Sequence, residues 1–265
     1  MQQSKKNTFS IKNAIMFGLK TFWTEKWLFT KIIFIAMLGL LAVFLITFAL
    51  GTLGIISTIS ISKITTIFFN QNFREIVAPG EGTFSGIKGL YALLAVLAII
   101  WSFLGIGLGV KYISCKLYDH RVVEVTDLFS KYGLIGTFIF GHILYSLISI
   151  TGMILLIIPG IIWGVRFGLF SYAIVDKNMS ATQSLRYSYQ ITKNNFMRLF
   201  GLSLLTGLFS WPLQLLKAPE AATPTTQTIV GITIGLLSYC IVMIQSLIHA
   251  YAYKKLSEDR TLETK

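Results

Sequence analysis

The chain carries few charged residues. Only 13% of its 265 residues are Asp, Glu, Lys or Arg, whereas 54% are hydrophobic. A soluble domain of ordinary composition carries about a quarter of charged residues. The small charged fraction therefore excludes most soluble enzymes and indicates an integral membrane protein.

Cysteine, histidine and acidic residues are also scarce. The two cysteines, Cys115 and Cys240, are too few for a disulfide framework or a Cys-rich zinc site, and both are expected to be inert packing residues. The three histidines have no metal-ligand spacing. We therefore expect no metal, no cofactor and no enzyme activity. An intramembrane enzyme that uses His142 or His249 is an alternative that no motif favours.

The eleven acidic residues all fall outside the long apolar runs or at their ends. Proton- and sodium-coupled transporters usually hold an ionisable group inside the helix bundle. The absence of a carboxylate in the middle of any run therefore disfavours a coupled transporter, while uncoupled flux stays possible.

Six apolar runs separate the clusters of charge. Their approximate bounds are residues 32–61, 90–110, 134–158, 161–175, 199–216 and 229–253. A helix of about 20 apolar residues crosses the hydrocarbon core of a bilayer. We therefore predict an all-α, polytopic protein with six transmembrane helices in a single membrane domain over residues 1–265. A removable signal peptide is not expected, because no short apolar core with a cleavage site precedes the long first run.

The third and fourth runs are nearly continuous, so two spans require a sharp reversal between them. Proline and glycine interrupt helices, and Gly152 and the pair Pro159 and Gly160 lie at the right place. We predict a turn between Gly152 and Gly160. A single kinked helix over both runs is the alternative.

The distribution of positive charge supports six crossings. When successive segments are assigned to alternate sides, 18 Lys and Arg fall on the side that holds both termini, and five fall on the other. Loops on the cytoplasmic side retain Lys and Arg. The pattern predicts a multi-pass protein of a bacterial inner membrane with cytoplasmic N- and C-termini. In such a protein a net charge of +12 favours anionic lipid as a partner, and nucleic acid is not implied.

Two basic segments resemble each other when Ser10 is aligned with Ser180. In each, a serine able to cap a helix precedes small and apolar residues at helical spacing along one face. Both segments are predicted to be amphipathic helices at the membrane surface. The aligned stripes are Ala14, Ile15, Gly18 and Phe22 in the first segment, and Ser184, Leu185, Ser188 and Thr192 in the second.

Cations on these two segments are candidate contacts for anionic lipid or for a partner protein: Lys12, Lys20, Arg186 and Lys193. Residues Val125–Tyr132 are a shorter candidate for a third surface helix. The chain would then contain three repeats, each a surface helix followed by a helical hairpin. The alternative is that any basic helix beside a membrane shows the same pattern.

One cation, Arg166, lies within the fourth apolar run. A charge inside the membrane is costly and often functional. We consider two interpretations: its side chain extends to the outer interface, or it makes a structural or lipid-phosphate contact inside the bundle. Gln214 and Gln245 are expected to form hydrogen bonds between helices.

Several short motifs resemble those of a known family. They are Ile158–Ile162, Arg166, Ala173–Asp176, Ser180–Ser188, Thr192–Asn195 and Leu199–Phe200. These motifs resemble the bacterial six-span family related to the membrane domain of glycerophosphoryl diester phosphodiesterases, most strongly over residues 155–205. Ser184 stands where that family often has Ala.

The resemblance implies a fold and no reaction. In the phosphodiesterases of that family the catalytic domain is a separate soluble barrel, for which this chain has no residues left over. We therefore expect a non-enzymatic inner-membrane protein that interacts with anionic lipid or organises a membrane-protein partner or a second copy of itself. A transporter, a permease or an accessory subunit, with Arg166 and Gln245 as polar contacts, is the alternative.

Overall fold

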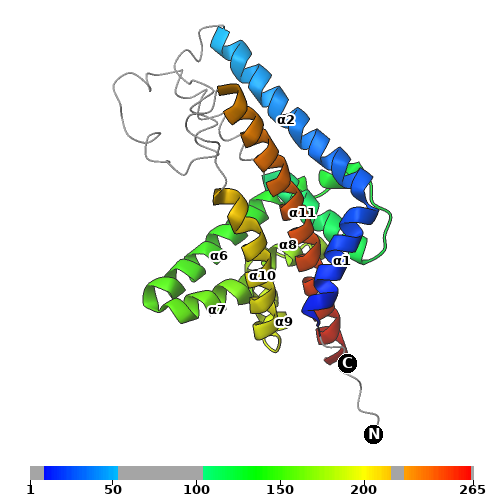
Figure 1. Cartoon of the computed structure of the whole chain (residues 1–265). Helices are drawn as coiled ribbons and strands as arrows, with labels where there is room; N and C mark the ends of the chain where they lie inside the picture. The colour runs from blue at the N-terminus through cyan, green and yellow to red at the C-terminus, as the bar shows by residue number, and fades with distance from the viewer. Residues whose placement is uncertain (1–8, 53–103, 216–223, 264–265) are drawn as a thin grey trace. The chain divides into compact units, whose positions relative to one another are not determined.

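The computed structural model describes residues 9–52, 104–215 and 224–263 (Figure 1). Within these ranges all regular structure is helical, which agrees with the predicted all-α class. The chain divides into two compact units, Met1–Ile33 with Gly105–Lys265, and Phe34–Leu104. Of the second unit, the structure describes the part of α2 (Lys26–Thr52) from Phe34 onward and Leu104. The remaining elements belong to the first unit.

The described residues of the first unit form seven labelled α-helices, an unlabelled helix over residues 104–118 and two short 3-10 helices, besides the start of α2. The labelled helices are α1 (Ile11–Thr24), α6 (Ile135–Leu155), α7 (Ile157–Phe167), α8 (Phe170–Lys177), α9 (Ala181–Thr192), α10 (Phe196–Leu215) and α11 (Pro224–Glu263). The 3-10 helices are η1 (Val125–Leu128) and η2 (Tyr132–Leu134).

Three described helical segments are long and apolar enough to cross a membrane: Val125–Leu155, Ile157–Lys177 and Ile229–Thr261. They correspond to the third, fourth and sixth predicted spans. The fifth predicted span is helical as α10, and α2 covers the first span as far as Thr52. Residues 53–103, which include most of the second span, lie outside the described part. Six crossings therefore stay a prediction.

The third and fourth spans form an antiparallel hairpin of α6 and α7 (Figure 1). The chain reverses at Leu156, whose backbone is extended (φ −161°, ψ 137°). Pro159 and Gly160 lie just beyond this reversal, in the first turn of α7, where a missing proline N–H leaves no helical bond unmade. Gly160 allows the two arms to approach, because a Cβ atom there would lie 2.6 Å from the amide nitrogen of Met153.

The candidate for a third surface helix, Val125–Tyr132, is helical only in short 3-10 turns. This segment forms η1 and the start of η2 instead of an α-helix. Two hydrogen bonds explain the tight turns: the carboxylate of Asp127 accepts from the backbone N–H of Glu124 at 2.8 Å and from Nζ of Lys116 at 2.8 Å. The three-repeat interpretation therefore loses its middle surface helix.

The core of the first unit is built around α8. Its residues from Phe170 to Val175 are all buried, and α8 packs against α6 and α9. The small-residue stripe predicted in α9, including Ser184 and Ser188, is buried against this core. On the other side, α1 packs against α11 through Ala14 and Gly18.

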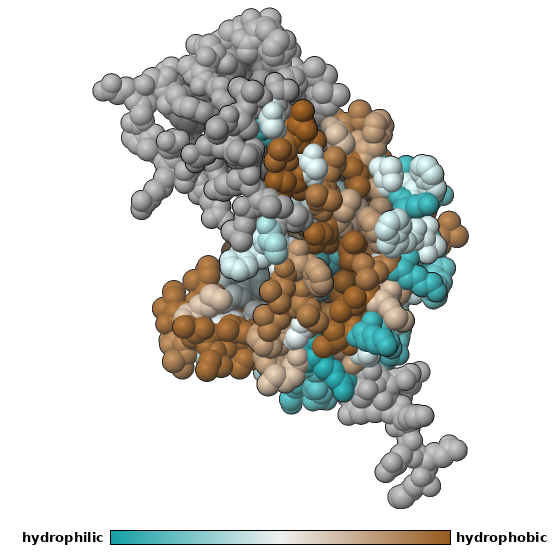
Figure 2. Space-filling model, in the orientation of Figure 1, coloured by the Kyte–Doolittle hydropathy of each residue, from teal (hydrophilic) through white to brown (hydrophobic). Residues whose placement is uncertain are grey.

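Hydrophobic and hydrophilic side chains are separated on the visible surface. Figure 2 shows hydrophobic residues at the tip of the α6–α7 hairpin and hydrophilic residues near the C-terminal end of α11. At the hairpin tip Ile154, Leu156 and Ile158 are each more than two-thirds exposed. An apolar tip of this kind is stable when lipid surrounds it.

Candidate functional site

Segments that the charge pattern assigns to one side of the membrane meet at one end of the first unit, which we call the basic end. It comprises α1, the last turn of the 104–118 helix, α9, the start of α10 and the last turns of α11. Three hydrogen bonds join these segments: Arg198 Nη1 to the Phe9 carbonyl (3.1 Å), Tyr118 Oη to Glu258 Oε1 (3.1 Å), and Tyr187 Oη with Ser257 Oγ. The structure thus brings together elements from four charged stretches of the chain, since α9 and the start of α10 belong to the same stretch.

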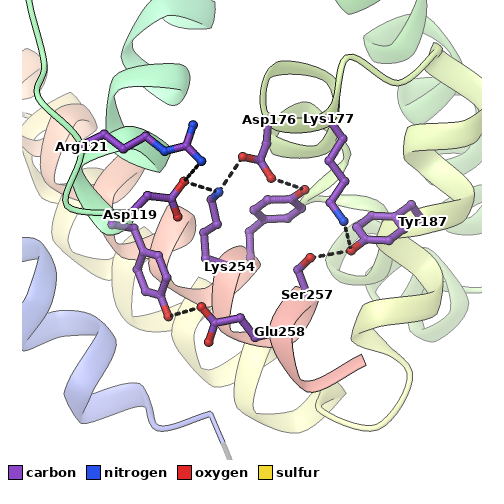
Figure 3. A network of polar contacts seen from close by, with 10 residues as sticks. Asp119, Arg121, Asp176, Lys177, Tyr187, Lys254, Ser257 and Glu258 are labelled. Atoms are coloured by element: carbon purple, nitrogen blue, oxygen red, sulfur yellow. Dashed lines mark hydrogen bonds and ion pairs between the residues drawn. The ribbon is translucent and has the colours of Figure 1, made fainter. Parts of the chain in front are cut away.

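An ion cluster holds the basic end together (Figure 3). The ammonium of Lys254 on α11 lies 2.6 Å from Asp176 Oδ1 and 2.8 Å from Asp119 Oδ2. Tyr253 Oη donates to the second oxygen of Asp176 at 3.1 Å, and Arg121 lies 3.5 Å from Asp119. The side chains of Lys254, Asp119 and Asp176 are only 12%, 21% and 17% exposed. These groups compensate one another's charges and hydrogen-bonding capacity, so we assign the cluster a structural role.

Local sequence explains how the two carboxylates reach Lys254. Asp119 follows the last turn of the 104–118 helix, and Asp176 lies in the last turn of α8. Left-handed residues redirect the chain soon after each of them: His120 (φ 53°) and Asn178 (φ 50°). No local sequence pattern predicts this cluster, because its charged members lie far apart in the sequence and each resembles an ordinary charged residue beside an apolar run.

Two other groups at this end are kept neutral. Burial, together with the nearby Glu258 carboxylate, raises the pKa of Tyr118 well above its usual range, so its hydroxyl stays a donor. Cys115 is 2% exposed. Burial and the Asp176 carboxylate raise the pKa of its thiol, which supports the predicted inert packing role.

The four predicted surface cations are all exposed, but their two helices differ. Lys12 and Lys20 project from α1, and Arg186 and Lys193 project from α9 and the residue after it. α1 also exposes large hydrophobic side chains, and Trp27 at the start of α2 is 72% exposed. α9 exposes no large hydrophobic side chain, because its apolar stripe faces the core. Only α1 therefore has the mixed outer face of a helix that lies in an interface.

The capping predictions also differ between the two helices. Ser180 forms a reciprocal capping box with Gln183 at the start of α9. Ser10 occupies the same position before α1, but its side chain makes no capping hydrogen bond.

Arg166 lies near the end of α7 and contacts α9. Its guanidinium carbon is 4.8 Å from the ring centroid of Tyr189, and its Nε is buried without a hydrogen-bond partner. The backbone carbonyl of Arg166 accepts hydrogen bonds from Ser188 Oγ at 2.7 Å and from Thr192 Oγ1 at 3.2 Å. Arg166 is ten residues, about 15 Å of helix, beyond the hairpin tip at Leu156. Its side chain therefore belongs to the α7–α9 contact.

Hydrogen bonds between helices occur in the interior, as predicted for Gln245. Its Nε2 donates to the Thr206 carbonyl at 2.7 Å and to Ser210 Oγ at 2.8 Å, which joins α11 to α10. The side chain of Gln214 lies outside the described residues. Deeper in the unit, Ser114 Oγ and Ser246 Oγ are 3.0 Å apart.

Lys111 is a half-buried cation in the 104–118 helix. Its Nζ lies 5.5 Å from the ring centroid of Phe138 and 5.9 Å from that of Tyr172. The ring of His142 lies beside Phe138, and His249 Nδ1 contacts the Gln245 carbonyl at 2.8 Å. Among the residues with described positions, no three His, Cys, Asp or Glu side chains are grouped closely enough to bind a metal.

No protein-family model, curated protein or solved structure matches the chain. The resemblance to the six-span family over residues 155–205 therefore stays a prediction.

Proposed function

We propose that this chain is a non-enzymatic, multi-pass inner-membrane protein that binds anionic lipid at its basic end. One observation carries the proposal: segments with an excess of Lys and Arg, far apart in the sequence, are held together at one end of a helical unit that has membrane-length apolar segments. Each exposed Lys or Arg near an anionic membrane surface contributes about 1 kcal/mol of attraction.

The outer face of α1 supports the same proposal. It combines the cations Lys12 and Lys20 with Met16, Leu19 and Trp23, which are 57%, 44% and 70% exposed. Tryptophan and basic residues are enriched where a protein crosses the boundary between hydrocarbon and water. α1 would lie at the cytoplasmic surface, and Arg186 on α9 would reach lipid phosphates from the aqueous side.

The six-span fold and the cytoplasmic position of both termini are part of this proposal. With the basic end in the cytoplasm, α10 would leave it, and α11, which packs against α10, would return to it. The inner membrane then places anionic headgroups beside the cations.

The test measures lipid enrichment around the protein. The full chain is extracted with its surrounding lipid into polymer nanodiscs, and mass spectrometry gives the ratio of anionic to zwitterionic phospholipid relative to the whole membrane. We expect enrichment for wild type and its loss in the triple variant Lys12→Glu, Lys20→Glu, Arg186→Glu. The charge-preserving triple variant Lys12→Arg, Lys20→Arg, Arg186→Lys is the control. Equal enrichment in all three proteins would contradict the proposal.

The same preparation, made after crosslinking in cells, tests the partner-organising form of the proposal. A membrane-protein partner or a second copy of the chain should copurify in fixed stoichiometry. Recovery of anionic lipid alone would restrict the function to lipid binding.

A further inference from the structure

A basic cavity of about 780 Å³ lies at the basic end, between the end of α9, the start of α10 and the last turns of α11. Lys193, Arg198 and Arg260 line it, against a single carboxylate, Asp259. The cavity therefore carries a positive balance from three separate elements. Its wall also includes apolar side chains, among them Phe196 and Met197.

Two of these cations are held in position by the protein. Arg198 donates to the Phe9 carbonyl at 3.1 Å, and Arg260 hydrogen-bonds Gln190 and lies 5.6 Å from the ring centroid of Tyr187. Cations that are already ordered lose little entropy when an anion binds. The N-terminus of α10, whose first turn contains no acidic residue, adds positive potential at the same place.

A second cavity, an apolar groove of about 600 Å³, continues along α10. Phe200, Leu204, Gly207, Leu208 and Trp211 line it at spacings of three and four residues, so they share one face of the helix. Among the described residues no charged side chain lines the groove. Its far wall is Val165 of α7.

The two cavities border successive stretches of α10, the basic cavity at residues 196–198 and the groove from Phe200 to Trp211. From Phe196 in the basic cavity to Trp211 in the groove is 15 residues, or about 22 Å of helix. This matches the depth of one leaflet including its headgroups, which is half of a bilayer about 40–45 Å thick. Arg166 connects the two linings, because it follows Val165 of the groove and its guanidinium carbon lies 4.8 Å from the ring centroid of Tyr189, which lines the basic cavity.

We propose that the basic cavity and the groove together bind one anionic phospholipid. Its phosphate lies among Lys193, Arg198 and Arg260, and an acyl chain lies along α10 between Phe200 and Trp211. Charge complementarity defines the occupant: an anionic headgroup suits the basic cavity, and only an attached hydrocarbon chain suits an uncharged groove of leaflet length. This inference rests on the proposed lipid-binding function and gives it one stoichiometric site.

Gly207 offers a selective way to block the groove. A Cβ atom on Gly207 would meet nothing within 4 Å, so a large side chain can enter the groove without disturbing the fold. Gly231 on α11 is a matched control, because a Cβ atom there also meets nothing within 4 Å, while the residue lines neither cavity.

The test counts lipids bound to the full chain in mild detergent by native mass spectrometry, with dioleoyl phosphatidylglycerol as the probe. Wild type and Gly231→Trp should each retain one lipid molecule, and Gly207→Trp should bind it at least about tenfold more weakly. Lys193→Gln should weaken phosphatidylglycerol binding by about fivefold and leave phosphatidylcholine binding unchanged. Equal occupancy in the two tryptophan variants would overturn the site.

A second measurement does not depend on a variant that folds. Phosphatidylglycerol with a photoreactive acyl chain should crosslink wild-type protein within residues 200–211. Crosslinks found only in other peptides would contradict the proposed position of the chain.

The failure of this site can be told apart from the failure of the proposed function. If nanodisc enrichment depends on Lys12, Lys20 and Arg186 while Gly207→Trp keeps its lipid, the single site is wrong and the surface function stands. If Gly207→Trp loses its lipid while the nanodisc enrichment of anionic lipid does not depend on those three cations, the site stands and the surface function is wrong.

Discussion

At the scale of single residues, Lys254 is the centre of the ion cluster at the basic end. Its side chain is only 12% exposed, and its ammonium forms ion pairs with two carboxylates that come from different elements. Removing one partner from a poorly hydrated ion cluster costs more than the cluster contributes, because charges of like sign are then left together without compensation. The neighbouring Lys255 differs, since its ammonium lies 3.3 Å from Glu258, an i,i+3 partner whose side chain is 50% exposed.

We therefore expect Lys254→Met to lower the free energy of unfolding by about 2 kcal/mol, because Asp119 and Asp176 would lose their shared cation. Unfolding by sodium dodecyl sulfate in mixed micelles, followed by circular dichroism, measures the change. The matched variant Lys255→Met should cost at most about 0.5 kcal/mol. Similar losses of unfolding free energy in both variants would show that the ion cluster stabilises the protein no more than the exposed pair of Lys255 and Glu258 does.

At the scale of elements, close packing distinguishes α1 from an ordinary helix attached to a membrane surface. Gly18 faces α11, and a Cβ atom on it would lie 2.5 Å from Ile248 Cγ1 and 3.3 Å from the Ile244 carbonyl oxygen. Rings of α1 and α11 also meet, with Phe17 and Tyr251 centroids 5.3 Å apart. α1 is therefore part of the packed unit while its outer face stays available to lipid.

Gly18→Leu should separate α1 from α11 and cost about 1–3 kcal/mol, since a packed interface cannot accept added volume. Hydrogen exchange over Ile11–Thr24 should become faster in this variant. Gly136→Leu in α6, where a Cβ atom would meet nothing within 4 Å, is the control and should leave exchange in α1 unchanged. Unchanged exchange in Gly18→Leu would mean that α1 is not held by this contact.

At the scale of the whole molecule, the main feature is the gathering of the basic segments at one end of the first unit. A positive-inside bias requires that these segments share one side of the membrane. The contacts of α1, α9 and the end of α11 are compatible with that requirement. The compartment that this end faces can be tested directly.

Single cysteines introduced into a variant without native cysteines should reveal the orientation. Lys12→Cys and Thr182→Cys, both at exposed positions, should react with a membrane-impermeant maleimide only in inside-out vesicles. Glu220→Cys, in the predicted connection between the fifth and sixth spans, should react only in right-side-out vesicles. Labelling of all three from the same side would disprove the six-span topology.

The sequence alone determined the features that depend on local composition. The apolar runs predicted α6, α7 and α11, because a helix that crosses the hydrocarbon core of a bilayer needs about 20 consecutive apolar residues. Helical spacing predicted α9, and a helix breaker near Gly160 predicted the reversal found at Leu156.

Only the tertiary structure decided which faces and charges meet. The stripe of α9 looked suited to a membrane surface, yet Ser188 and Thr192 are turned inward to the Arg166 carbonyl. Lys254 joins Asp119 and Asp176 across 135 and 78 residues. Periodicity reports that a helix has two faces, but what each face contacts depends on the packing of elements distant in the chain, and no local pattern encodes those pairings.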